Sequence, residues 1–229
     1  MALLLGIDDA GRGPLIGPMI LAGVLVDKNQ EAFLKKHGIT DSKLLEHKRR
    51  MGMAKLIQAN SLDSEIVKST PEEIDYSITT GINLNTLEAI KAAEIINKIN
   101  NEKRHNDKIK VVIDCPSINI SAWKNTLLRY IKYLDNLEVE CEHKADFNHT
   151  SVSAASILAK CTREEEIEKI KKQFKSTGNI GSGYPSDPAT KEFLKKHGSN
   201  LKDSGIFRKT WATWKSMFPE PKQSTLGEF

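Results

Sequence analysis

The chain has 229 residues and a formal net charge of +4, and 39% of its residues are hydrophobic. These values fit one substantial core with room for a small appended lobe, and the mild positive charge permits an anionic partner without requiring one. Three scattered cysteines with no Cys-x-x-Cys pair argue against structural zinc and a disulfide framework. The longest apolar stretch, residues 19–26, is too short to span a membrane. The first residues resemble a core strand rather than a signal peptide, so we expect a soluble, cytoplasmic protein.

Apolar runs bounded by Gly, Pro and charged residues predict strands along the chain. In the first half we expect strands at 3–9 and 18–26. Helix starts are indicated at Thr40-Asp41-Ser42-Lys43 and at Thr70-Pro71-Glu72-Glu73, where Pro and acids suit a first helical turn. Apolar residues then keep helical spacing from Leu84 to Ile96. This half therefore alternates strands with helices.

The second half continues the alternation. We expect strands at 110–115 and 137–142 and helices at about 121–134 and 150–174. A loop rich in Gly, Ser and Pro covers 176–189, and a basic, aromatic segment follows it. Alternating strands and helices predict an α/β layered domain.

Four acids occur where strands end or helices begin: Asp8, Asp9, Asp114 and Asp146. Ligands collect outside the carboxyl ends of strands in open α/β sheets, so Asp8 and Asp114 would be neighbours if their strands are adjacent. Hard cations such as Mg²⁺ and Mn²⁺ prefer carboxylate oxygens, and two such ions can promote an in-line phosphoryl displacement. Each acid alone could equally be a turn former or a helix cap. The joint pattern, beside the turn Gly11-Arg12-Gly13 that suits phosphate, favours chemistry on a phosphodiester.

Six motifs occur along the chain, in the order Gly6-Ile-Asp-Asp-Ala-Gly-Arg-Gly-Pro14, Asp41-Ser-Lys43, Val112-Ile-Asp114, Lys144-Ala-Asp146, Val152-Ser-Ala-Ala-Ser-Ile-Leu-Ala-Lys160 and Gly181-Ser-Gly-Tyr-Pro-Ser-Asp-Pro188. Together they resemble the ordered motifs of type 2 ribonuclease H, the ribonuclease HII family, and the last of them resembles its archaeal branch. The resemblance implies a ribonuclease H-like fold: a mixed five-stranded sheet flanked by helices, with a small helical C-terminal segment. We expect a catalytic domain over 1–180, a substrate-binding segment over 181–218 and a flexible tail over 219–229.

The resemblance also implies a metal-dependent endoribonuclease with roles in DNA repair and replication. It would cleave the RNA strand of RNA–DNA hybrids and single ribonucleotides embedded in duplex DNA, 5′ of the ribonucleotide, leaving 3′-hydroxyl and 5′-phosphate ends. Carried over position by position, two Mg²⁺ or Mn²⁺ ions would be held during catalysis by Asp8, Asp9, Asp114 and Asp146. An aspartyl phosphatase is a poorer interpretation, because that chemistry needs two acids separated by one residue.

The sequence departs from the family pattern at one position. The family typically has Asp-Glu where this chain has Asp8-Asp9. Losing one methylene retracts the carboxylate by about 1.5 Å, and a misplacement on that scale can cost on the order of a hundredfold in rate. The alternative function is therefore a hybrid-binding or clamp-associated module with weakened catalysis.

The resemblance assigns substrate contacts to two segments. The backbone of Gly11, Arg12 and Gly13 would contact the 2′-hydroxyl of the target ribonucleotide, the group that distinguishes RNA from DNA. The ring of Tyr184 would stack on the sugar of the following deoxynucleotide. The bland alternatives are a tight turn that needs its glycines and a tyrosine that packs a turn.

Basic residues supply further candidates. Lys43, Arg12 and Lys144 are candidates for phosphate or active-site contacts, with Lys144 the weakest because isolated lysines are usually solvated. Positive side chains in the C-terminal segment would bind the DNA backbone without reading sequence; these are Arg208, Lys209 and Lys215. We expect Trp211 and Trp214 to be core anchors.

The last seven residues, Gln223-Ser-Thr-Leu-Gly-Glu-Phe229, resemble a sliding-clamp binding peptide. Leu226 and Phe229 would enter an apolar pocket of the clamp while Gln223 hydrogen-bonds alongside. The alternative is a tail with chance hydrophobic residues. We expect the protein to be a monomer that binds nucleic acid and that also binds a sliding clamp through this tail.

Overall fold

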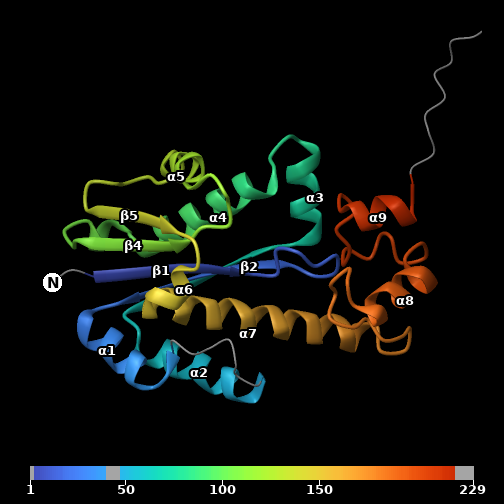
Figure 1. The fold of residues 1–229 in the computed structure, drawn as a ribbon, viewed down its shortest axis with the longest axis horizontal. Coiled ribbons are helices and arrows are strands. Elements are labelled where there is room, and N and C mark those ends of the chain that lie inside the picture. Colours follow the sequence, from blue (N-terminus) through green and yellow to red (C-terminus); the bar gives the residue numbers. More distant parts are fainter. Residues whose placement is uncertain (1–2, 40–46, 220–229) are drawn as a thin grey trace, which may run out of the picture.

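The computed structural model of the chain describes residues 3–39 and 47–219 (Figure 1). Its centre is a five-stranded sheet in the order β3-β2-β1-β4-β5. The strands are β1 (Leu3–Ala10), β2 (Met19–Val26), β3 (Asp63–Ser69), β4 (Ile109–Asp114) and β5 (Leu137–Glu142). The pairings of β1 with β2 and of β2 with β3 are antiparallel, whereas β1–β4 and β4–β5 are parallel. The predicted mixed five-stranded sheet is confirmed.

Helices cover both faces of this sheet (Figure 1). One face packs against α7 (Thr150–Gln173), with α1 (Lys28–Lys36) and α2 (His47–Asn60) beside it. The other face packs against α4 (Leu84–Ile99), together with α3 (Pro71–Thr79) and α5 (Ile120–Leu128). None of the described helices is long and apolar enough to cross a membrane.

Strand alternation distributes β1 between the two faces. Leu3, Leu5 and Ile7 belong to the core under α4, so the even-numbered residues face α7. Gly6 lies where α7 approaches most closely, because a Cβ at Gly6 would lie 2.2 Å from the Ser151 carbonyl carbon. Only glycine allows that approach, and it brings the start of α7 against the strand that ends in the first acids.

The C-terminal segment forms a third core at the end of the sheet (Figure 1). It contains α8 (Pro188–His197) and α9 (Ala212–Met217). Phe193, Phe207 and Trp214 pack there on Leu15 and Ile16 from the β1–β2 connection. Trp214 is thus a core anchor as predicted. The half-buried Trp211 packs against both this core and the one under α4.

Most predicted elements are present, with several differences. The charged strand β3 and the helices α1 and α6 (Ala145–Asn148) were not predicted. The helical spacing after residue 70 belongs to two helices, α3 and α4, separated by a turn in which Gly81 has φ +91°. The helix expected to reach residue 134 ends at Leu128. The predicted helix start at 40–43 lies outside the described residues.

Candidate active site

Three of the predicted acids meet at one end of the sheet. Asp8 is near the end of β1, Asp114 ends β4, and Asp146 lies in the short helix α6 (Ala145–Asn148). Each contributes a carboxylate oxygen to a group whose members all lie within 4.8 Å of one another. Ile7 pairs with Ile113 in parallel register, so the residues that follow them lie side by side. Three convergent carboxylates are a ligand set that suits a hard divalent cation.

The turn before α6 brings the third acid to the other two. Lys144 has φ +58°, and its backbone N–H donates to Asp114 Oδ1 at 2.8 Å. This left-handed residue ends the run from β5 and starts α6, two residues before Asp146. Lys144 therefore contributes through its backbone, while its side chain is exposed.

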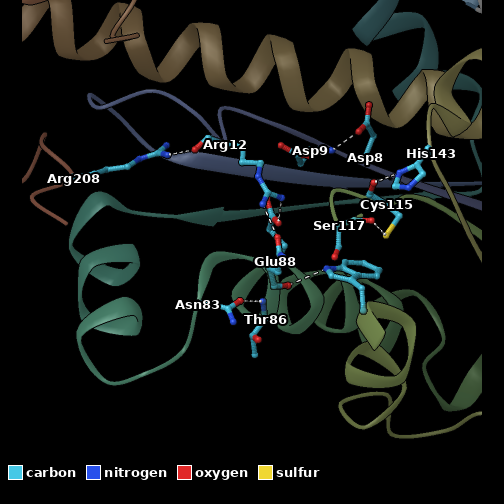
Figure 2. Close-up of polar contacts among 12 residues, drawn as sticks. Asp8, Asp9, Arg12, Asn83, Thr86, Glu88, Cys115, Ser117, His143 and Arg208 are labelled. Atoms are coloured by element: carbon cyan, nitrogen blue, oxygen red, sulfur yellow. Dashed lines mark hydrogen bonds and ion pairs between the residues drawn. The ribbon is translucent and has the colours of Figure 1, made fainter. Parts of the chain in front are cut away.

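The electrostatics of Asp8 fit a cation site. Burial, together with the charges of Asp9 and Asp114, raises the pKa of Asp8 to about 7, although a hydrogen bond with Ser156 opposes the rise. The Asp9 N–H also donates to Asp8 Oδ1 at 2.7 Å (Figure 2). A buried carboxylate near other carboxylates is destabilised by the repulsion between their negative charges. A bound cation would offset that repulsion.

Asp9 lies on the opposite face of β1 from Asp8. It follows the alternation of Leu5 and Ile7 toward α4 and is not part of the three-acid group. The pKa of Asp9 is raised to about 6, chiefly by burial, even though the nearby charge of Arg12 opposes the rise. Of the four acids that the resemblance assigns to the metals, the structure brings together Asp8, Asp114 and Asp146. Asp9 is outside that group, although it lines a small cavity with Asp8 and Asp114.

The turn after β1, which we call the substrate loop (Gly11–Gly13), is held by side chains from distant parts of the chain. Gly11 has φ +88°, a conformation that glycine adopts readily. The Arg12 guanidinium pairs with Glu88 and donates to Asn85 Oδ1 at 2.5 Å, both on α4. The Trp211 indole N–H donates to the Gly13 carbonyl at 3.2 Å.

Arg208 has a role different from the expected one. Its side chain is fully buried, and its guanidinium donates to the carbonyls of Gly11 at 2.6 Å, Arg12 at 2.8 Å and Gly17 at 2.9 Å. A side chain so enclosed cannot reach a DNA phosphate, so the predicted backbone contact is wrong. Arg208 instead fixes the substrate loop from the C-terminal segment (Figure 2).

Tyr184 lies across a cleft from the substrate loop. The cleft has a volume of about 380 Å³ and is lined by both, together with Asp9. The Arg163 guanidinium carbon, on α7, lies 4.9 Å from the centre of the Tyr184 ring, and the same side chain donates to the Ser182 carbonyl at 3.0 Å. Tyr184 is 38% exposed, which leaves surface for a ligand. The structure therefore places the predicted tyrosine and the predicted loop around the same cleft.

Comparison with known proteins shows the family of the chain. The sequence matches the ribonuclease HII family over residues 5–214. The chain belongs to the ribonuclease HII family. It is 40% identical over 225 residues to the ribonuclease HII of Methanococcus maripaludis strain C5, covering 98% of this chain and 90% of the relative. As a ribonuclease HII, it is a divalent-metal-dependent endoribonuclease of RNA–DNA hybrids.

Two solved ribonuclease HII structures share the whole fold. The ribonuclease H2 of Pyrococcus horikoshii OT3 is 34% identical with a TM-score of 0.80, and the match covers 94% of this chain and 96% of that one. The ribonuclease HII in a PCNA complex from Archaeoglobus fulgidus is also 34% identical, with a TM-score of 0.78 and coverage of 99% and 100%. The fold and the archaeal resemblance are thus confirmed.

The other predicted contacts lie away from the acids or outside the described residues. Lys209 and Lys215 line a separate cleft of about 900 Å³ between α3 and the C-terminal segment. There Lys209 Nζ lies 3.3 Å from Asp203, and Asp75 accepts the Lys209 backbone N–H at 2.6 Å. Outside the described residues lie Lys43, Gln223, Leu226 and Phe229.

Four polar residues that line the cleft between Gly11–Gly13 and Tyr184 were not among the predicted site residues. They are Arg50, Lys160, Arg163 and Glu164. Arg50 pairs with Glu164, and Lys160 Nζ donates to Ser156 Oγ at 2.7 Å. The spacing of Lys160 and Arg163, three apart on one helix, could have indicated a common basic face. Glu88 gave no signal, because an acid within an apolar helical pattern is ordinarily solvated.

Proposed function

We propose that this ribonuclease HII cuts single ribonucleotides embedded in duplex DNA as well as the RNA strand of hybrids. The cut falls on the 5′ side of the ribonucleotide and leaves 3′-hydroxyl and 5′-phosphate ends. The observation that carries the proposal is that the three-acid group and the cleft beside Tyr184 meet at Asp8 and Asp9. Its neighbour Asp8 belongs to the three-acid group, while Asp9 itself lines the cleft between the substrate loop and Tyr184.

In this proposal the acids hold two divalent cations, Mg²⁺ or Mn²⁺, during catalysis. Asp8, Asp114 and Asp146 supply ligands from one face of the sheet, and Asp9 completes the set from the other. Such ions, when bound, activate a water and stabilise the departing 3′-oxygen. The hydrogen bonds from the Asp9 N–H and Ser156 hold the Asp8 carboxylate in a fixed orientation.

Recognition of the substrate is divided between the loop and the tyrosine. The backbone of Gly11–Gly13 reads the 2′-hydroxyl, since that group marks RNA, and Tyr184 stacks on the sugar of the next deoxynucleotide. Together they select a ribonucleotide followed by DNA. Lys43, and Lys209 and Lys215 on the C-terminal segment, contact phosphates without reading sequence.

The chain divides by role in the same proposal. Residues 1–180 carry the chemistry, 181–218 support substrate binding, and 219–229 bind a sliding clamp through Gln223, Leu226 and Phe229. The Archaeoglobus fulgidus relative, whose structure is a complex with PCNA, supports the clamp assignment. Replacing Phe229 with Ala should abolish co-elution with an archaeal clamp and leave cleavage unchanged. Unaltered co-elution would remove the tail from the proposal.

Three duplexes test the proposed activity: one with a single ribonucleotide, one RNA–DNA hybrid and one all-DNA. Each is incubated with the protein in Mg²⁺ and separately in Mn²⁺, with Asp146→Asn as the inactive control. We expect cuts in the first two duplexes only. Binding of the single-ribonucleotide duplex without a cut in either metal would favour the weakened-catalysis alternative, and Asp9→Glu should then restore cleavage.

A further inference from the structure

The proposed mechanism leaves one buried charged group without a task. Glu88 lies in α4 among Leu87 and Ala89, and its side chain is 1% exposed. A buried carboxylate is costly unless it is paired and hydrogen-bonded. A second oxygen of the same group, Oε1, is buried with no hydrogen-bond partner in the described part of the chain. The unfavourable burial of this carboxylate suggests that Glu88 has a function.

Glu88 binds the side chain of the substrate loop. Its Oε2 pairs with Arg12 Nη1 (Figure 2). Asn85, one turn earlier on α4, accepts from Arg12 Nη2 at 2.5 Å. The two acceptors take both terminal nitrogens of the guanidinium, which suits the fixed fork of arginine. Arg12 is therefore anchored to α4 and is not available as a free phosphate contact.

Further contacts hold the start of α4, which carries Asn85. The Asn83 side chain caps α4 by accepting the Thr86 N–H at 3.0 Å (Figure 2). The Trp123 indole N–H, from α5, donates to the Asn85 carbonyl at 2.9 Å. The cap and the contact from α5 hold the first turn of α4, which carries Asn85 and leads directly to Glu88.

Contacts from two sides fix the loop backbone between them. Arg208 donates to the carbonyls of Gly11 and Arg12 from the C-terminal segment, and Glu88 holds the Arg12 side chain from α4. Glu88 also lines a small cavity with Asp9 and Asp114. The charge of Arg12 thus acts on both Glu88 and Asp9, and it opposes the rise in the pKa of each carboxyl that burial causes.

We propose that Glu88 is a positioning residue that fixes the substrate loop through Arg12 and so sets the discrimination between ribose and deoxyribose. It touches neither substrate nor metal. The inference rests on the proposed reading of the 2′-hydroxyl by the Gly11–Gly13 backbone. A loop released from α4 would still bind DNA through phosphates but would lose part of its selectivity for a ribonucleotide.

The test compares affinities for two duplexes that differ by one 2′-hydroxyl. Binding is measured by fluorescence anisotropy in an Asp114→Asn background, which prevents cleavage. Glu88→Gln keeps the size of the side chain and removes its charge. We expect the ratio of affinities, ribonucleotide duplex over all-DNA duplex, to fall about tenfold, the effect of one weakened charged hydrogen bond. Glu94→Ala, a partly exposed acid of the same helix that pairs with Lys98, should leave the ratio unchanged.

A second pair of variants separates positioning from general damage to the fold. In an Arg12→Ala background, Glu88→Gln should change the ratio no further, because the contact through which it acts is already gone. A further fall there, an equal loss on both duplexes, or an unchanged ratio would overturn the inference. Failure of the proposed function looks different: the Asp114→Asn protein would bind both duplexes alike and the parent protein would cut neither, which overturns both.

Discussion

Replacing Asp8 with Asn should abolish cleavage and, in the absence of metal, stabilise the fold. Burial and the neighbouring acids raise the pKa of Asp8 from 3.8 to about 7, so ionised Asp8 is unfavourable in the folded protein. Asn has the same shape, cannot ionise, and its oxygen can still accept the Asp9 N–H. The variant removes the charge and keeps the contact.

The size and the pH dependence of this effect follow from linkage. Between pH 3.8 and pH 7 the folded state binds more protons than the unfolded state, so the free energy of unfolding of the wild type falls as the pH rises. Each pH unit between the two pKa values is worth about 1.36 kcal/mol, which amounts to about 4 kcal/mol at pH 8 and roughly 1–2 kcal/mol at pH 5. Asp8→Asn should therefore be more stable than the wild type by about these amounts.

Urea unfolding in the presence of EDTA at pH 5 and pH 8 measures the difference. Asp135→Asn, at an exposed position, is the matched control and should change stability little. Adding Mn²⁺ should stabilise the wild type by mass action and the Asp8 variant much less. The reasoning would be refuted by a variant less stable than the wild type at pH 8, or by a stability gain that does not grow with pH.

Three further variants test other parts of the account. Asp9→Glu lengthens the side chain by about 1.5 Å and should raise the rate on a single-ribonucleotide duplex about tenfold or more; an unchanged single-turnover rate would mean that the site has adapted to aspartate. Tyr184→Ala should lower kcat/KM about tenfold on that duplex and less on a continuous hybrid, and equal losses would contradict stacking at the junction. Arg208→Lys cannot span the carbonyls of Gly11, Arg12 and Gly17, and should lower the free energy of unfolding by about 2–3 kcal/mol in urea titrations; a loss under about 0.5 kcal/mol would contradict the bracing role.

Local patterns in the sequence were sufficient to predict the strands and the helix that carry or adjoin the acids. Strands 3–9 and 110–115 and the helix 150–174 were predicted close to their observed bounds, because continuous apolar runs and long helical spacing are strong signals. Strand β3 was missed because its edge position leaves most of its residues partly or fully exposed, among them the partly exposed Glu65 and the exposed Lys68. Charged residues on an edge strand interrupt the apolar pattern by which a strand is predicted.

The contacts that brace the site could not be predicted from the sequence. Arg208 bonds to Gly11, 197 residues away, and Glu88 pairs with Arg12, 76 residues away. Both residues belong to charged types that are ordinarily exposed, and only the packed fold reveals that they are buried. The separation of Asp9 from the other acids has a simpler origin, because adjacent residues of any β-strand point to opposite faces of the sheet.

The position of the cut on a duplex with one ribonucleotide tests the central claim most directly. With either strand end-labelled and Mg²⁺ or Mn²⁺ present, we predict a single break 5′ of the ribonucleotide, with a 3′-hydroxyl that a DNA polymerase extends and a 5′-phosphate on the fragment that carries the ribose. Loss of the cut in Asp114→Asn would assign it to this site. A break on the 3′ side, a 2′,3′-cyclic phosphate end, or equal cutting of the all-DNA duplex would contradict the account.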